Sequence, residues 1–441
     1  MAVDFNFQDS SKEQENQRLI EDDDRLNIRY IPEEIRHRDK QMERIAEKTL
    51  SEVAAGKKGS DLLILGPPGT GKTATVKYMV DQTRQHNPGD KFEILYVNCS
   101  TYSSGQALFK QLCEKVGADF KPGVELAKNI NRFKDKIREK GGKSILIVLD
   151  EIQELHSDRR DHLSKPVLYE LSRPTEGQEL DDWSGNITIA GISNDPEILE
   201  YVDDDVMSSL EGPKIVEFPT YTVDEITDIV HERQVEAYVQ PVLSGSSLRK
   251  IAEEVQDNFN SDVRKTIEIL KKIPSKVENT DYLSTNEDRQ KQVVDEIITE
   301  LQKDRIREVC YSKEDDFYIV MSALQQQLLH DKAKLKYITE AYGRACEMAM
   351  REKKGSNFAA RRSYVYRQLE KLVEANLLEK KKSYQEINKP NRYHANFDLD
   401  IFQEIIEDQL RRKDLLKNLK EEDYSVQAEK QAEEVLDSHM E

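Results

Sequence analysis

The stretch GPPGTGKT, from Gly66 to Thr73, decides the fold that we expect for this chain. It matches the pattern G-x-x-x-x-G-K-[S/T], in which glycines let backbone N–H groups turn toward a phosphate, Lys72 supplies positive charge and Thr73 offers a hydroxyl to Mg²⁺. The apolar strand DLLIL precedes the loop and the helical pattern TATVKYMVDQTR follows it, so a helix would point its positive end at the anion. The stretch therefore predicts a site for ATP or ADP with Mg²⁺, and the residues expected at the phosphates are Gly69, Thr70, Gly71, Lys72 and Thr73.

Short apolar strands continue on both sides of this loop and alternate with helical patterns up to about Phe218. Besides DLLILG they read FEILYVNC, SILIVLDE and NITIAGIS. Such alternation is typical of a parallel sheet covered by helices. We therefore expect an α/β fold with a P-loop parallel-sheet core.

Polar side chains follow two of these strands. Asp150 and Glu151 end SILIVLDE, where one carboxylate can hold Mg²⁺ together with Thr73 and the next can orient and deprotonate an attacking water. Asn194 ends the strand NITIAGIS and is suited to holding that water near the γ-phosphate, although an Asn at this place also forms turns. Asp150 is thus predicted as a metal ligand, and Glu151 and Asn194 as catalytic residues.

After Phe218 the strand signals stop and helical patterns take over. Three helical stretches at about 223–239, 246–256 and 262–272 predict a small all-helical domain, and a polar segment after Pro274 reads as a linker to a long amphipathic helix. The domains that we expect are a flexible acidic tail over 1–25, a nucleotide-binding core over 26–218, a helical lid over 219–275, a linker and connecting helix over 276–312, a winged-helix DNA-binding domain over 313–400, and a charged C-terminal helix or tail over 401–441.

The bulk composition narrows the class of protein. A chain of 441 residues is long enough for about three domains. Apolar runs such as ILIVL are far shorter than the ~20 residues that a bilayer requires, and no basic and apolar leader opens the chain. The four cysteines lie far apart without CxxC spacing, which favours neither a disulfide framework nor a zinc site. These features favour a soluble, cytoplasmic protein without a membrane partner.

The net charge of −19 argues at first against a nucleic-acid partner, but the distribution of charge reverses this. Residues 353–392 contain eleven Lys and Arg against four Glu, a local balance of +7. Within AARRSYVYRQLEKLVEAN, a buried stripe of Val365, Leu369, Leu372 and Val373 predicts a helix with a polar opposite face. The residues expected on that face are Tyr364, Arg367 and Lys371.

A β-hairpin is expected after this helix, because apolar strand ends flank the turn former INKPN. Its basic residues near the tip are Lys380, Lys381, Lys382, Lys389 and Arg392. The order helix, helix, helix, hairpin is that of a winged helix, which places one helix in a major groove of DNA. Such domains also serve protein contacts, so the basic residues could instead be merely solvated.

The combination GPPGTGKT, LDEI and GISND resembles the AAA+ ATPases. Over nearly the whole chain the resemblance extends to archaeal replication initiators of the origin-recognition and cell-division-control type. YIPEEIRHRDKQME resembles their N-terminal segment beside the adenine, LYVNC their second strand, FPTYTVDEITDIVHER the start of their lid, SDVRKTIEIL their second sensor, and ELQKDRIREV the helix before their winged helix.

This resemblance implies roles that the residue patterns alone do not give. It implies that Tyr221 lies against the nucleotide base with Arg233 in the same pocket, and that Arg264 is a lid arginine that contacts the γ-phosphate and reports its loss. It further implies that the chain binds duplex DNA at replication origins, helps to recruit the replicative helicase and acts with other initiator paralogues.

One departure from the AAA+ pattern bears on catalysis. YVDDDVMSSLEGPK, where an arginine usually reaches the neighbouring subunit's site, contains none. We therefore expect slow ATP hydrolysis and an ATP/ADP switch. A nucleotide-regulated DNA-binding transcriptional regulator is an alternative that needs the same two devices, and a sliding-clamp loader is a second alternative for which neither a collar domain nor an arginine finger is visible.

Overall fold

The computed structural model describes residues 19–86, 90–102, 104–141, 143–154, 187–195, 198, 214–277, 280–310, 315–329, 333–348, 358–375, 377–381 and 392–412. The chain divides into two compact units. The first consists of Glu21–Ala237 together with Ser261–Ile267, and the remaining described residues form the second.

A parallel five-stranded sheet forms the centre of the first unit, as the sequence predicts. Its strands are β1 (Leu62–Leu65), β2 (Phe92–Asn98), β3 (Ser144–Asp150), β4 (Ile187–Ser193) and β5 (Lys214–Glu217), in the spatial order β2-β3-β4-β1-β5. Every residue of β3 and β4 is buried, which explains why these strands read as continuous apolar runs. Strand β5 was not expected, because three residues of KIVE are exposed at the sheet edge and the segment lacks an apolar run.

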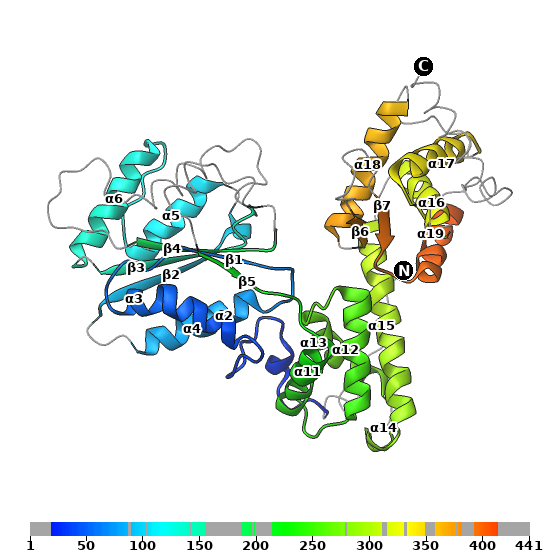
Figure 1. The fold of residues 1–441 in the computed structure, drawn as a ribbon, viewed down its shortest axis with the longest axis horizontal. Helices are drawn as coiled ribbons and strands as arrows, with labels where there is room; N and C mark the ends of the chain where they lie inside the picture. The colour runs from blue at the N-terminus through cyan, green and yellow to red at the C-terminus, as the bar shows by residue number, and fades with distance from the viewer. Residues whose placement is uncertain are drawn as a thin grey trace, which may run out of the picture. The chain divides into compact units, whose positions relative to one another are not determined.

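Helices cover both faces of this sheet (Figure 1). On one face lie α5 (Gly105–Val116) and α6 (Leu126–Glu139), packed on the strands in one apolar core. On the other face lie α2 (Asp39–Ile45), the π-helical turn Ala46–Leu50, α3 (Ser51–Ala54) and α4 (Lys72–Gln85), which share a second core with the strands. Two short 3₁₀ helices, Asp23–Leu26 and Cys99–Thr101, complete the unit's N-terminal half.

The parallel topology gathers the carboxyl ends of β1, β3 and β4 at one edge of the sheet. Strand β1 leads into the loop, β3 ends at Asp150 and β4 ends at Ser193. In parallel sheets ligands bind outside the carboxyl ends of the strands. This edge is therefore where the phosphate loop and the polar strand ends come together.

Helix α11 (Val223–Ala237) and the start of α13 (Arg264–Lys272) complete the first unit. Thr222 and Glu225 form a capping box at the N-terminus of α11, because the Thr222 N–H donates to Glu225 (2.8 Å) and the Glu225 N–H donates to the Thr222 hydroxyl (3.3 Å). Near the other end of the helix, the Glu21 N–H donates to the Ala237 carbonyl (2.8 Å). Residues 19–25, expected as the end of a flexible tail, are thus structured; residues 1–18 lie outside the described part.

Helices dominate the second unit. They are α12 (Gly245–Phe259), the remainder of α13, a 3₁₀ turn (Ile273–Lys276), α14 (Thr280–Thr285), α15 (Glu287–Cys310), α16 (Asp315–Leu329), α17 (Leu335–Met348), α18 (Phe358–Glu374) and α19 (Leu399–Arg412). The polar segment after Pro274, expected as a linker, contains the short helix α14, and the Gln290 side chain of α15 donates to the Leu283 carbonyl there (2.9 Å). The long connecting helix is α15.

The C-terminal part of the second unit has the expected order of three helices and a hairpin. Strands β6 (Leu378–Lys381) and β7 (Arg392–Ala395) pair antiparallel after α16, α17 and α18. Of the predicted buried stripe, Val365, Leu369 and Leu372 are fully buried in one core, whereas Val373 is only partly buried against it. Helix α19 adds Phe402 and Ile406 to this core. Residues 401–441 were expected as a charged C-terminal helix or tail separate from the winged-helix domain; α19 is the start of this helix but packs in the same core as α16 to α18, and residues 413–441 lie outside the described part.

Candidate functional site

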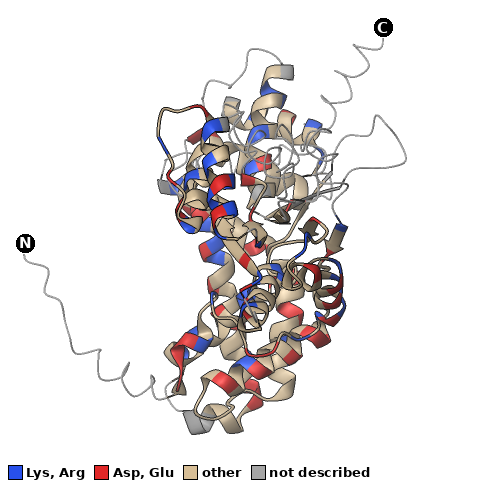
Figure 2. Cartoon of the chain, turned by 90° about the vertical axis from the view of Figure 1, so that its left-hand side faces the viewer, with Lys and Arg blue, Asp and Glu red and all other residues tan. Residues whose placement is uncertain are grey.

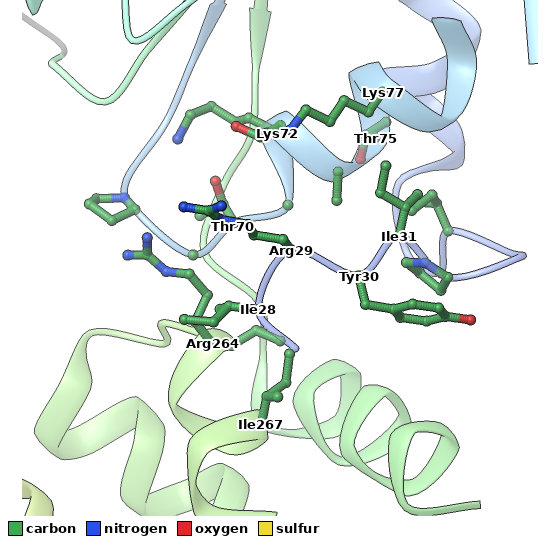
Figure 3. Close-up of a pocket in the computed structure, with 18 of the residues that line it drawn as sticks. Ile28, Arg29, Tyr30, Ile31, Thr70, Lys72, Thr75, Lys77, Arg264 and Ile267 are labelled. Atoms are coloured by element: carbon green, nitrogen blue, oxygen red, sulfur yellow. The ribbon is translucent and has the colours of Figure 1, made fainter. Parts of the chain in front are cut away.

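A cavity of about 760 Å³ lies in the first unit, at the carboxyl edge of the sheet. Cavities of this size are typical of sites that bury a small ligand. Figure 3 shows Thr70 and Lys72 of the loop on one side, Arg264 and Ile267 on the opposite side, and the segment from Ile28 to Ile31 beside them. Every nucleotide-site residue predicted from the sequence lines this cavity: Gly69, Thr70, Gly71, Lys72, Thr73, Asp150, Glu151, Asn194, Tyr221, Arg233 and Arg264.

Gly69 and Gly71 of the loop could not be replaced by larger residues, for reasons of backbone angle and of space. Gly69 has φ 74° and Gly71 has φ 84°, both in the left-handed region. A Cβ on Gly69 would lie 2.1 Å from Asp262 Oδ1, and a Cβ on Gly71 would lie 2.6 Å from the Tyr221 hydroxyl. The loop is thus closely approached by residues far away in the sequence, and a larger side chain at either position would displace them.

Lys72 begins α4 and is 5% exposed. Its ammonium donates to the carbonyls of Gly66 (2.5 Å) and Pro67 (2.8 Å), so the side chain follows the inner side of the loop. Burial lowers the pKa of Lys72 to about 8, and the nearby Asp150 carboxylate opposes this shift. The Lys72 ammonium, which a phosphate would contact, therefore loses its proton at a lower pH than an exposed lysine does.

The carboxylate of Asp150, at the end of β3, is 3% exposed and has several donors. The Thr73 hydroxyl donates to it at 3.1 and 3.2 Å, the Glu151 N–H donates to its Oδ1 at 3.1 Å, and the Tyr96 hydroxyl donates to its Oδ2. A hydroxyl and a carboxylate are oxygen ligands of the kind that Mg²⁺ prefers. The donor set at Thr73 and Asp150 therefore fits the predicted metal.

Protein ligands alone would not complete such a metal site. Among the residues that the structure describes, no group of three or more His, Cys, Asp or Glu could hold a metal ion. Mg²⁺ is commonly bound by one or two protein groups together with substrate phosphates and waters. The Thr73 and Asp150 pair suits this second kind of site.

Glu151 and Asn194 line the cavity from two adjacent strand ends. Glu151 has φ 56°, which a side-chain-bearing residue adopts only at a cost of about 1–3 kcal/mol when the surroundings impose it. Strain of this kind concentrates at functional sites. After Asn194, the Asp195 N–H donates to the Ser193 hydroxyl (2.9 Å), so the turn-forming alternative for this segment also applies.

Tyr221, which lines the cavity, is in contact with a residue that the sequence did not single out. Arg38 is 2% exposed, and its guanidinium carbon lies 3.5 Å from the centroid of the Tyr221 ring. Its nitrogens donate to the carbonyls of Thr70 (3.0 Å) and Pro219 (2.9 Å). Burial lowers the pKa of Arg38 and raises that of Tyr221. Arg38 thus fastens the phosphate loop to Tyr221 and to the segment before α11.

Arg233 of α11 is 7% exposed and forms an ion pair with Glu236 (3.1 Å). Its guanidinium carbon lies 4.7 Å from the centroid of the Tyr30 ring, in the N-terminal segment that lines the cavity. Arg36 of the same segment pairs with Glu232 at 2.8 Å. These contacts hold the N-terminal segment on α11.

Arg264 reaches the cavity opposite the loop, but its guanidinium is bound by a neighbouring carboxylate. Asp262 accepts from Arg264 at 2.6 and 2.9 Å, and this hydrogen bonding raises the pKa of Arg264. Asp262 is the same residue that lies against Gly69. It was not predicted, because it stands two positions before the arginine in an ordinary polar stretch.

The residues that the sequence predicts to bind DNA belong to the second unit. Arg367 and Lys371 are exposed on α18, as expected, and so is Arg362, which was not named from the sequence. Tyr364 is half-buried, with its ring 5.7 Å from that of Tyr342, so the expectation that it lies on the exposed face is wrong.

The basic hairpin is only partly described. Lys380 and Lys381 lie in β6 and Arg392 begins β7, whereas Lys382 and Lys389 lie outside the described residues. Figure 2 shows Lys and Arg interspersed with Asp and Glu on many of the described helices.

Within the described part of the chain, no helix is long and apolar enough to cross a membrane.

The parallel sheet of order β2-β3-β4-β1-β5, the glycine loop after β1 and the acidic end of β3 define the fold of a P-loop ATPase of the AAA+ class. A family described as an AAA domain matches residues 57–179. The α/β fold with a P-loop parallel-sheet core of the AAA+ class, expected from the sequence, is confirmed.

Comparison with individual proteins confirms the expected resemblance to archaeal ORC1-type replication proteins. The chain is 32% identical to ORC1-type DNA replication protein 1 of Sulfurisphaera tokodaii over 244 residues, which cover 55% of this chain and 58% of that protein. The match thus spans less than two thirds of that protein's length.

Two solved structures share the fold over most of both chains. The Aeropyrum pernix ORC1 protein in complex with DNA has a TM-score of 0.63 at 20% identity and covers 89% of this chain and 97% of its own. The Aeropyrum pernix ORC2 protein in ADPNP–ADP complexes has a TM-score of 0.63 at 19% identity and covers 90% of this chain and 99% of its own.

Proposed function

We propose that this chain is an ATP-dependent DNA replication initiator that binds origin duplex DNA, helps to recruit the replicative helicase and acts as an ATP/ADP switch. The single observation that supports this most is the cavity of about 760 Å³ on which the phosphate loop, both acidic strand-end residues and the predicted lid residues Tyr221, Arg233 and Arg264 converge. The similar Sulfurisphaera protein is named an ORC1-type DNA replication protein, and the similar Aeropyrum proteins are described in complex with DNA and with ADPNP and ADP.

Each cavity residue has a role in this proposal. Backbone N–H groups of the loop and the Lys72 ammonium bind the phosphates, and Thr73 with Asp150 holds Mg²⁺, which would neutralise phosphate charge. Glu151 takes a proton from the attacking water, and Asn194 orients that water. Tyr221 lies against the nucleotide base, and Arg233 lies in the same pocket. Hydrolysis is slow, since we assign no arginine from a neighbouring subunit.

Arg264 is the residue that reads the nucleotide state in this proposal. A γ-phosphate competes with Asp262 for its guanidinium, and loss of the phosphate returns Arg264 to Asp262. Arg264 begins α13, and from Glu268 onward this helix groups with the second unit. When ATP is hydrolysed, the exchange of partners at Arg264 would therefore act on a helix that continues into the second unit.

The second unit binds duplex DNA through α18 and the hairpin. Arg367 and Lys371 are exposed on α18, and eleven Lys and Arg concentrate in residues 353–392 of an otherwise acidic chain. Because phosphate contacts dominate such binding, affinity should fall steeply with salt. Other initiator paralogues are expected beside the chain on DNA.

Footprinting of the full chain on origin-flanking and promoter DNA, with ATP and with ADP, tests this function. We expect protection of origin-flanking DNA that differs between the two nucleotides. Lys72→Ala should abolish nucleotide binding and remove this difference, whereas Lys57→Ala, at an exposed lysine of the same unit, should behave as the unchanged protein. Protection of promoter DNA alone would favour the transcriptional regulator, and normal ATP affinity of Lys72→Ala would refute the assigned site.

A further inference from the structure

Tyr96 lies beside the predicted metal site without having a role in the proposed function. In the parallel pairing of β2 with β3, Asn98 is the partner of Asp150 and Tyr96 is the partner of Val148. Residues two apart on a strand share a face, so Tyr96 is on the face of the sheet from which Asp150 projects. Its hydroxyl donates to Asp150 Oδ2.

Donors from different elements hold the two oxygens of the Asp150 carboxylate. The Glu151 N–H donates to Oδ1 at 3.1 Å, while Tyr96 donates to Oδ2 and the Thr73 hydroxyl lies 3.1–3.2 Å from both oxygens. Rotation of the carboxylate would break the contacts of Tyr96 and of the Glu151 N–H. The plane of the carboxylate is thereby set before any cation binds.

The Tyr96 side chain is a restrained donor. A phenol carries one O–H group, and here that group donates to Asp150 Oδ2. The Lys77 ammonium lies 5.1 Å from the centroid of its ring, a cation–π contact that restrains the ring from α4. A protonated and restrained phenol can hold a carboxylate in one orientation.

We propose that Tyr96 is a positioning residue of this site, which orients the Asp150 carboxylate for binding a divalent cation together with the nucleotide. This inference rests on the proposed nucleotide site. Hydrogen bonds to a ligating group from outside the metal's own ligands typically change metal affinity by about 10–100-fold. Tyr96 would therefore affect the cation-dependent part of nucleotide binding and leave the cation-independent part unchanged.

Tyr96→Phe in the full chain is the test, because it removes one oxygen and keeps the ring. A fluorescent ATP analogue is titrated onto the protein in EDTA and at increasing Mg²⁺, and thermal melting checks that the variant is folded. We expect the Mg²⁺ concentration for half-maximal enhancement of binding to rise about tenfold or more, with affinity in EDTA unchanged. Tyr78→Phe, a half-buried tyrosine of α4 that does not line the cavity, is the matched control and should keep the original Mg²⁺ dependence.

Two results with a folded variant would overturn the inference. One is an unchanged Mg²⁺ dependence of Tyr96→Phe, and the other is an equal loss of affinity with and without Mg²⁺, which would indicate a general structural role. Failure of the unchanged protein to bind the analogue under any condition would instead refute the proposed nucleotide site, on which this inference depends.

Discussion

The lowered pKa of Lys72 predicts that ATP affinity depends on pH above neutrality. Burial brings this pKa to about 8 in the nucleotide-free protein. A bound triphosphate would favour the ammonium and return the pKa toward or above the ordinary value of about 10.4. The bound state then holds a proton that part of the free population lacks, so affinity must fall as pH rises above the free pKa.

The size of the effect follows from the protonated fraction of free Lys72. With a pKa of about 8, this fraction is about 0.9 near pH 7 and about 0.09 near pH 9. ATP affinity should therefore fall about tenfold between these pH values, which corresponds to about 1.4 kcal/mol. Below about pH 7 the affinity should be nearly constant with respect to Lys72.

Isothermal titration calorimetry in buffers of different ionisation enthalpy measures the same linkage independently. Near pH 9 each ATP that binds should take up about 0.9 proton, and near pH 7 about 0.1. Nucleotide that binds with equal affinity at both pH values, or without proton uptake near pH 9, would refute the idea that Lys72 is neutralised by burial and recharged by phosphate.

Two further predictions concern stability. Arg38→Met leaves buried backbone carbonyls without a donor, and each such carbonyl costs about 1–3 kcal/mol. Urea unfolding without nucleotide should therefore show that the free energy of unfolding falls by roughly 3 kcal/mol. The control Arg36→Met removes a half-exposed ion pair and should lower the free energy of unfolding by about 1 kcal/mol or less. Leu369→Ala opens a cavity in the core of the second unit and should lower the free energy of unfolding by about 2–5 kcal/mol. Arg367→Ala, at an exposed position of the same helix, should change the free energy of unfolding by no more than about 0.5 kcal/mol but should weaken DNA binding in a salt-dependent way. Equal stability of these two α18 variants would contradict the buried stripe.

The parts of the site that could be predicted from the sequence are those encoded by neighbouring residues. The loop after β1 places its glycines, Lys72 and Thr73 within eight positions, and the acidic pair follows directly on β3. Such patterns are local because one loop or one strand end supplies all the groups.

The contacts that were missed join residues that are far apart in the sequence. Arg38 and Tyr221 stack, and Tyr96 reaches Asp150 through strand pairing. Neither Arg38 nor Tyr96 is distinguished by its own neighbours in sequence. Helical periodicity failed for Tyr364 for a similar reason, because an aromatic partner on α17 draws this ring toward the core, which a pattern along α18 alone cannot reveal.

Lys72 and Arg264, which line the cavity, differ from the neighbouring buried Arg38 in which of their contacts a bound nucleotide could replace. Arg38 is 2% exposed and bound to backbone carbonyls, so a phosphate cannot take its donors without breaking the attachment of the loop. Lys72 and Arg264 each line the cavity and have partners, the loop carbonyls and Asp262, that a triphosphate can replace. The two replacements differ in cost.

Carbonyls released by Lys72 are neutral, whereas Arg264 would leave a carboxylate behind. The Asp262 side chain is only 16% exposed and lies against the loop, so its charge would be poorly solvated after Arg264 left it. In this proposal ADP contacts only Lys72 and does not compensate for the poorly solvated Asp262 carboxylate. A γ-phosphate adds negative charge that binds Arg264 and can offset this cost. In the proposed ATP/ADP switch, the Asp262 carboxylate would therefore set the threshold between the two nucleotide states, from a position in direct contact with the phosphate loop.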